Sequence, residues 1–313
     1  MADTTPTADR ADTTLSSADP GVWRGAARRR AGAPRGRAAG ARARARLWGS
    51  LAVLGALVLA AVVVPAVFGG GDLVRYDSVR LAPGPAHPFG TDSAGRDLFV
   101  QSLAGLRVSL LVAGTSALVS TVLGSLVGAV AGALGGWSDR LLMRAVDTVN
   151  SVPHLLLGIV IVALYRGSLL AVVLSIALTH WTTVARVVRS EVLSLRQRPF
   201  VDAAIAGGSS RMRVLRRHLL PAIVPQAALS AVLLVPHAVW HETSLSFLGL
   251  GLPPHLASIG NILGDGREAV LLGAWWIVLF PSLLLVVTTL AVSGPAGVWR
   301  DRVVPRRRSE LAL

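Results

Sequence analysis

The chain has 313 residues, of which 52% are hydrophobic and 15% charged, a balance that is unusual for a water-soluble domain. All 31 basic residues are arginines, and with 17 acids they give a formal net charge of +14. Because the arginines fall between apolar runs and not on one soluble domain, nucleic acid is not an expected partner. The absence of cysteine excludes disulfides, zinc–thiolate sites, iron–sulfur clusters and cysteine nucleophiles.

The first 46 residues carry few large apolar side chains, and nine arginines lie between Arg24 and Arg46. Low hydrophobicity with this much positive charge predicts a disordered, arginine-rich tail over residues 1–46. The apolar run that follows is about twice as long as the core of a secretory signal peptide and lacks a convincing cleavage site. It is therefore expected to be a retained anchor.

Six apolar stretches are long enough to cross a bilayer, whose core of roughly 30 Å requires about 20 helical residues. The sequence therefore predicts an all-α polytopic membrane protein with six transmembrane helices. Only Arg166 and Gly167 separate the third stretch from the fourth, so these two helices are expected to form a hairpin. The predicted spans are residues 47–68, 106–134, 141–165, 168–188, 226–250 and 271–292.

Arginine is distributed unevenly between the loops, and cytoplasmic loops are the ones that carry excess arginine. The tail at 1–46, the segments around 140–144 and 186–217, and the region 300–308 are rich in arginine. The alternate loops have few arginines, most of them matched by acids. Both termini are therefore expected in the cytoplasm, with residues 69–105 outside, spans two to six within residues 106–295, and a cytoplasmic tail at 296–313.

The one sizeable cytoplasmic loop, residues 189–225, has the pattern of two short helices joined by a turn. Pro199 favours a break before a first helix at 200–206, and Gly207 and Gly208 favour a turn. Ser210 is placed to cap a second helix at 211–220, which is expected to end against Pro221. A solvated amphipathic connector has the same composition. DNA binding is disfavoured because spans tether the loop at both ends.

This loop resembles the EAA loop of ABC-importer permeases, the element that docks on the cytoplasmic ATPase. The resembling residues are Asp202-Ala203-Ala204, Gly208 and Leu220-Pro221, with Asp202 standing where the family usually has glutamate. Small residues are expected to permit close backbone approach at the turn. The resemblance thus implies an ATPase-coupling loop composed of Asp202, Ala203, Ala204, Gly208, Leu220 and Pro221.

Two further segments resemble the peptide/nickel branch of that family. They are residues 87–92 (HPFGTD) with 95–97 (GRD), and residues 245–251 (LSFLGLG). The resemblance covers roughly residues 72–295, although Ser293-Gly294-Pro295 lacks the acidic turn usual at that place. It implies the type I permease fold in a bacterial plasma membrane, without enzyme activity. It also implies as partners a second homologous permease subunit, two ATPase subunits and an extracytoplasmic binding protein.

ATP hydrolysis is expected to occur in the partner subunits, because the chain contains no Walker A phosphate-binding loop. No cofactor is expected in the chain itself. A membrane enzyme would require acids and bases clustered at one depth, whereas the acids here lie scattered near the ends of spans. A channel would not require a docking loop. An importer permease is therefore the favoured class.

Polar side chains within spans are costly and raise a functional question. His237 and His241 share one helix face, and imidazoles at this spacing suit a transient Ni²⁺, Co²⁺ or Zn²⁺ site. With His180 and Glu242 they form a candidate substrate path. The alternative is that the histidines form hydrogen bonds between packed helices and bind no ligand.

The choice of cargo depends on two segments that resemble nickel-import permeases more than oligopeptide permeases. These are residues 177–181 (ALTHW), together with the arginines that follow, and residues 237–241 (HAVWH). The first interpretation is therefore import of nickel or a metal chelate. The alternative is import of oligopeptides or dipeptides, with the histidines structural.

Overall fold

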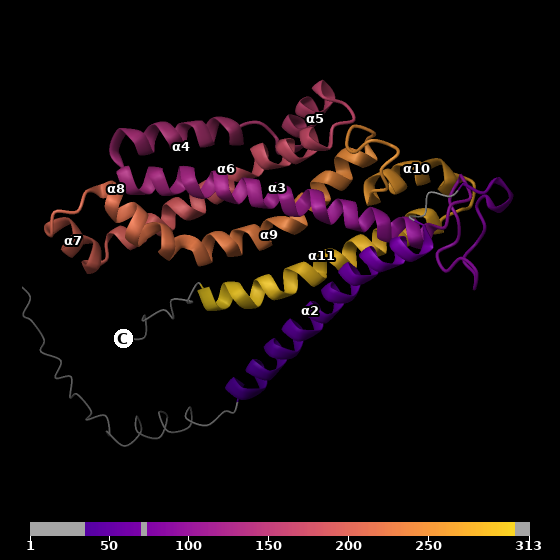
Figure 1. The fold of residues 1–313 in the computed structure, drawn as a ribbon, viewed down its shortest axis with the longest axis horizontal. Coiled ribbons are helices and arrows are strands. Elements are labelled where there is room, and N and C mark those ends of the chain that lie inside the picture. The colour runs from indigo at the N-terminus through magenta and orange to yellow at the C-terminus, as the bar shows by residue number, and fades with distance from the viewer. Residues whose placement is uncertain (1–34, 70–73, 304–313) are drawn as a thin grey trace, which may run out of the picture. The chain divides into compact units, whose positions relative to one another are not determined.

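The computed structural model describes residues 35–69 and 74–303, and these contain helices and loops but no β-strand. Contacts divide the chain into Met1–Arg44 and Ala45–Leu313, and the packing described below lies within the second unit. The helices are α2 (Arg35–Phe68), α3 (Leu98–Leu134), α4 (Gly136–Asn150), α5 (His154–Leu164), α6 (Leu169–Arg196), α7 (Pro199–Ala206), α8 (Arg211–Val214), α9 (Leu220–Phe247), α10 (Ile259–Leu271) and α11 (Trp276–Val303), with a 3₁₀ turn, η1 (Tyr76–Ser78), and a π-helical turn, η2 (Leu215–Leu219) (Figure 1).

Five of the helices are long and apolar enough to cross a membrane, and a sixth span results if α4 and α5 are counted together. This confirms the predicted all-α polytopic architecture. The third span is nevertheless not the single helix predicted over 141–165, because α4 and α5 meet at 81°. Pro153 lies at the break, where it lacks an N–H donor and disfavours helical geometry at Val152.

Several helix boundaries differ from the predicted ones. The first helix begins at Arg35, so residues 35–46 are helical, while residues 1–34 of the predicted disordered tail lie outside the described part. Helix α3 begins at Leu98, inside the predicted loop 69–105, because Asp97 caps it by accepting hydrogen bonds from the N–H groups of Phe99 and Val100. The hairpin between α5 and α6 is confirmed, and Gly167 has a φ of +74° in its turn.

Helix α3 packs closely along α6 through glycines spaced four residues apart. A Cβ at Gly124 would lie 2.4 Å from the carbonyl oxygen of Trp181, and one at Gly128 would lie 2.3 Å from that of Ala185. Side chains at these positions would therefore occupy space that the α6 backbone fills. Small residues at four-residue spacing are the usual means by which helices in a membrane bring their backbones together.

Helix α3 is long, and arginine side chains bond to its C-terminal end. Its 37 residues give a length of about 55 Å, which exceeds the hydrocarbon core of a bilayer. At its C-terminal end, Arg196 donates a hydrogen bond to the carbonyl of Gly132 (2.7 Å) and Arg211 to that of Leu134 (3.1 Å). These guanidinium groups satisfy carbonyls of the last turn and complement the negative end of the helix dipole.

Candidate functional site

The first helix of the predicted coupling loop forms as expected and is held from one side. Pro199 opens α7, where its missing N–H removes no hydrogen bond. Val201 is buried in a cluster with side chains of α6, η2 and α9, which fixes α7 to the bundle. Asp202 and Ala203 are exposed and Ala204 is half-buried. Asp202 and Ala203 of α7 therefore face away from the bundle, while the buried Val201 holds the helix to it.

The turn after α7 depends on Gly208, whose φ is +83°. The N–H of Gly208 donates to the carbonyl of Ile205 (2.9 Å), and that of Ser209 donates to the carbonyl of Ala204 (3.0 Å). These two bonds are the pattern of a Schellman motif, in which glycine ends a helix in the left-handed region. A Cβ at Gly208 would meet no atom within 4 Å, so the glycine is required for conformation and not for the predicted close approach.

The second helix of the loop does not end at Pro221, contrary to the prediction. The Ser210 hydroxyl caps α8 as expected, accepting a hydrogen bond from Arg213 N (3.3 Å). The chain then continues through the π-helical turn η2 into α9, so one helical run extends from Arg211 to Phe247. The wider hydrogen-bond spacing of a π turn lets the helix continue although Pro221 has no N–H to donate. Leu220 and Pro221 thus begin α9, and Leu220 packs against the same apolar cluster as Val201 and Ala204 of α7.

Apolar side chains accompany the exposed part of the loop. Phe200 and Ile205 on α7 and Met212 on α8 are 45%, 48% and 42% exposed. The basic side chains Arg213, Arg216 and Arg217 follow on α8 and η2, and they are exposed as well. Large apolar groups surrounded by charge on a protruding turn are typical of a surface that contacts another protein.

Three histidines from three helices lie together, but they are not the set that the sequence predicts. The ring of His180 on α6 lies 5.1 Å from that of His241 on α9 and 5.5 Å from that of His154 on α5, centroid to centroid. His237 is exposed one turn earlier on α9. Among the described residues, no three His, Asp or Glu side chains are arranged to hold a metal ion. His154 is recognisable in the sequence as a polar residue of the third predicted span, but no local pattern shows that it meets His180, because the two come together only through the packing of α5 on α6.

Both ring nitrogens of His241 are buried, and neither has a hydrogen-bond partner among the described residues. His180 Nδ1, by contrast, lies 3.0 Å from the carbonyl oxygen of Ile176 and 2.8 Å from the hydroxyl of Thr179. The histidine cluster (His154, His180 and His241) is therefore only partly satisfied by its own chain. A buried polar group without a partner is costly, and such groups mark places where water or a ligand completes the hydrogen bonding.

Glu242 lies apart from the histidine cluster in a polar contact of its own. It is fully buried, and its carboxyl accepts hydrogen bonds from the hydroxyls of Ser109 (2.7 Å) and Ser246 (2.8 Å). The Ser246 hydroxyl in turn accepts a bond from Leu252 N (3.1 Å). The carboxyl thus connects α3, α9 and the loop after α9. In this arrangement Glu242 contributes to helix packing and has no exposed surface with which to contact a substrate.

The segment before α3 is folded by the residues of the GRD and HPFGTD motifs. Asp97 caps α3 and also lies 2.7 Å from His87 Nδ1. The buried Asp92 accepts hydrogen bonds from the N–H groups of Ala94 and Arg96, each at 2.8 Å. A Cβ at Gly95 would lie 1.7 Å from the carbonyl oxygen of Arg75, so only glycine fits there. These motif residues therefore build a compact lobe beside the start of α3.

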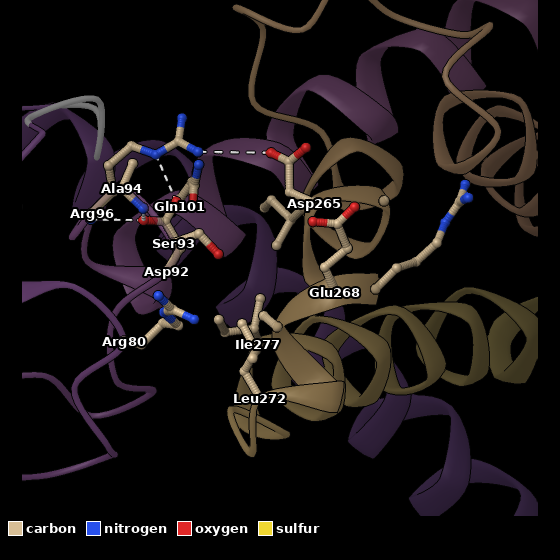
Figure 2. Close-up of a pocket in the computed structure, with 14 residues that line it drawn as sticks. Arg80, Asp92, Ser93, Ala94, Arg96, Gln101, Asp265, Glu268, Leu272 and Ile277 are labelled. Carbon is tan, nitrogen blue, oxygen red and sulfur yellow. Dashed lines mark hydrogen bonds and ion pairs between the residues drawn. The ribbon is translucent and has the colours of Figure 1, made fainter.

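This lobe and α10 enclose a cavity of about 660 Å³, which the sequence analysis did not predict (Figure 2). Its charged lining residues are Arg80, Asp92 and Arg96 from the lobe and Asp265, Arg267 and Glu268 from α10. The residues come from regions far apart in the chain, and no local pattern indicates that they meet.

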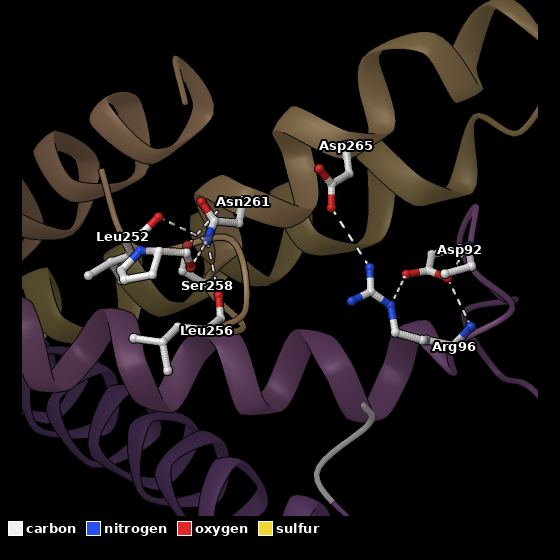
Figure 3. A network of polar contacts seen from close by, with 9 residues as sticks. Asp92, Arg96, Leu252, Leu256, Ser258, Asn261 and Asp265 are labelled. Atoms are coloured by element: carbon white, nitrogen blue, oxygen red, sulfur yellow. Dashed lines mark hydrogen bonds and ion pairs between the residues drawn. The ribbon is translucent and has the colours of Figure 1, made fainter. Parts of the chain in front are cut away.

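Asn261 fixes the loop that leads into α10. Its side-chain amide donates to the carbonyl groups of Pro253 and Leu256, each at 3.0 Å (Figure 3). Ser258 caps the helix by accepting a bond from Asn261 N (3.1 Å). One turn further along α10, Asp265 faces Arg96 of the lobe at 3.8 Å. The wall of the cavity formed by α10 is therefore held at its start by a local hydrogen-bond network.

Comparison with known proteins identifies the family. Residues 124–309 match the family described as the inner membrane component of binding-protein-dependent transport systems. A Brucella abortus protein named as a peptide transport system permease is 37% identical over 266 residues, which cover 83% of this chain and 88% of that protein. The dipeptide transport system permease protein of Bacillus subtilis is 33% identical over 264 residues, which cover 82% of each. The chain therefore belongs to the family of inner membrane permease components of binding-protein-dependent ABC importers.

Proposed function

We propose that this chain is a permease subunit of an importer for peptides, and that it forms half of the path through the membrane. The observation that carries the proposal is that relatives matching more than four-fifths of the chain are named as peptide or dipeptide permeases. This favours peptides over nickel, the two cargoes considered from the sequence. Nickel finds no such support among these relatives, and the described residues form no metal-binding set.

The α7 turn, meaning α7 with the turn at residues 207–209, is the proposed contact with a cytoplasmic ATPase. Asp202 and Ala203 are exposed there, and Phe200 and Ile205 add an apolar surface that a partner can cover. The buried Val201 fixes the helix to the bundle, so force applied to α7 is transmitted to α6 and α9. Two ATPase subunits, a second permease subunit and an extracytoplasmic binding protein complete the proposed importer. ATP is hydrolysed in the partners, and both termini of this chain are cytoplasmic.

The histidine cluster is proposed to lie on the path as a polar surface and not as a metal site. Its three rings come from α5, α6 and α9, and the nitrogens of His241 lack partners among the described residues. Peptide bonds carry donors and acceptors that can hydrogen-bond to imidazole during passage. His237 is exposed on the same helix, whereas Glu242 is proposed to act only in packing.

Uptake measurements test the cargo directly. A strain that lacks this chain is complemented with the wild type, with His237→Ala/His241→Ala, or with His237→Gln/His241→Gln, and uptake of radiolabelled dialanine and of ⁶³Ni²⁺ is measured. We expect the wild type to restore dipeptide uptake that excess nickel does not inhibit. Glutamine retains hydrogen bonding and loses most metal affinity, so the Gln variant should retain more transport than the Ala variant.

Membrane abundance of each variant, measured by immunoblot, is the control. Restored nickel uptake that is lost in both variants would contradict the proposal and support the metal path. Failure of the wild type to restore dipeptide uptake would also contradict it.

A further inference from the structure

The cavity between the lobe and α10 lies away from both the α7 turn and the histidine cluster, and nothing in the proposed function uses it. Its volume of about 660 Å³ falls within the range of small-molecule binding sites, roughly 300–1,000 Å³. Figure 2 shows charged side chains from two sides pointing into it, Arg80 from the lobe and Glu268 from α10. It is therefore a concave site with opposite charges on facing walls.

The back of the cavity is held rigid by an internal ion pair. Asp92 is only 4% exposed, and its carboxylate lies 2.6 Å from Arg96 Nε. The other side of the Arg96 guanidinium faces Asp265 at 3.8 Å, as Figure 3 shows. Gln101, also 4% exposed, lines the same wall. Because Asp92 and Arg96 neutralise one another, they position the walls and leave the remaining charges to a ligand.

Arg80 is held in the cavity by a costly backbone conformation. Its φ of +53° makes it the one non-glycine residue with positive φ among those that the structure describes. Two hydrogen bonds fix the conformation: Arg80 N donates to the carbonyl of Asp92 (3.0 Å), and Leu81 N donates to the hydroxyl of Thr91 (2.8 Å). Strained residues of this kind persist where their surroundings impose them, and they cluster at ligand sites.

Three of the lining charges make no ion pair among the described residues: Arg80, Arg267 and Glu268. Arg267 donates instead to the carbonyl of Phe247 and lies over the ring of that residue, which leaves Arg80 and Glu268 as the charges available to a ligand. Arg80 stands on the lobe, and Glu268 stands on α10 one turn after Asp265. A ligand that satisfies both walls must carry a negative group at one end and a positive group at the other.

We propose that this cavity binds a zwitterionic short peptide, with its C-terminal carboxylate against Arg80 and its N-terminal ammonium against Glu268 and Asp265. Arginine donates paired hydrogen bonds that match a carboxylate, and two acids on one helix turn suit an ammonium group. The choice of a peptide over a free amino acid rests on the proposed function, whereas the two-ended charge requirement follows from the cavity alone.

Binding to the full-length chain in lipid nanodiscs tests the proposal without any partner subunit. The probes are radiolabelled dialanine and the same dipeptide with an N-acetyl and a C-amide group. We expect the wild type to bind dialanine and to bind the blocked form at least about tenfold more weakly, since hydrogen bonds to charged groups are lost. Arg80→Gln and Glu268→Gln should each weaken dialanine binding by a similar factor.

Matched controls are Arg75→Gln and Asp77→Asn, which change exposed charges of the same segment that do not line the cavity. They should bind dialanine as the wild type does. The proposal is overturned if dialanine and its blocked form bind equally, if neither binds, or if Arg75→Gln is as damaging as Arg80→Gln. It is also overturned if Arg80→Gln and Glu268→Gln leave dialanine affinity unchanged.

This outcome is separable from that of the proposed function. Loss of dialanine binding in the variants would establish the site even if wild-type cells failed to take up dipeptide. If the chain supports dipeptide uptake but does not bind dipeptide in nanodiscs, the importer assignment stands and the proposed peptide site in the cavity is rejected.

Discussion

Gly208 is required for the backbone that it adopts and not for the space around it. Its positive φ closes the turn after α7, while a Cβ at this position would meet open space. An L-residue in the left-handed region costs roughly 1–2 kcal/mol, which is enough to lower the population of the turn about tenfold. The neighbouring Gly207 has an ordinary φ of −76°, so the two glycines are not equivalent.

We predict that Gly208→Ala reduces transport more than Gly207→Ala, although both add one methyl group. Gly208→Leu should abolish transport while the chain remains inserted, because the strain is local to the turn. Uptake of dialanine, normalised to the amount of chain in the membrane, is the measurement. Equal activity of the two alanine variants, or full activity of Gly208→Leu, would rule out a coupling role for this turn.

At the scale of single elements, the contact between α3 and α6 leaves no room for side chains at the crossing. A Cβ at Gly128 would lie 2.3 Å from the Ala185 carbonyl oxygen, whereas one at Gly114 on the same helix would meet nothing within 4 Å. Both glycines gain about 1 kcal/mol of helix propensity when changed to alanine. The difference between the two substitutions therefore isolates the packing at the crossing.

We predict that Gly128→Ala lowers the stability of the folded chain relative to Gly114→Ala by about 1–3 kcal/mol, the usual cost of overpacking. The measurement is the midpoint of thermal unfolding in detergent, followed by tryptophan fluorescence. A Gly128→Ala midpoint equal to or above that of Gly114→Ala would show that the helices do not approach as closely as described.

Helices are the elements that the sequence predicts best, because apolar runs of sufficient length have few other stable forms in a membrane. The break at Pro153 is only partly predictable, since proline in a span produces either a kink or an interruption according to its neighbours. The joining of α8 to α9 across Pro221 depends on the π turn η2, which no pattern in the sequence indicates. The cavity is beyond local reasoning, because Arg80 and Glu268 approach only when α10 packs beside the lobe.

For the whole molecule, the distribution of arginine predicts which end faces the cytoplasm. The lobe before α3 and the α7 turn lie at opposite ends of α3, as the contacts of its two ends show. The arginine-rich segments around residues 140–144 and 186–217 lie near the C-terminal end of α3, on the side of α7, and by the positive-inside rule we expect this side to be cytoplasmic. In that orientation we expect the lobe and its cavity to lie on the extracytoplasmic side.

We predict that single cysteines report this orientation cleanly, because the chain has none of its own. Ala82→Cys is exposed on the lobe and should react with an impermeant maleimide in intact spheroplasts. Ser209→Cys, in the turn after α7, should react only after the membrane is permeabilised, and each variant must retain transport. The reverse pattern of labelling would invert the topology.

The length of α3 has a mechanical consequence. One continuous helix of about 55 Å joins the end bonded to Arg211 to the end capped by Asp97, and its backbone approaches α6 most closely at Gly124 and Gly128. A stiff helix of this kind transmits tilt and absorbs little of it. A rotation of about 5° around its midpoint displaces each end by about 2.4 Å in opposite directions. A small movement imposed at the C-terminal end of α3 thus arrives at the cavity as a displacement large enough to make or break a hydrogen bond.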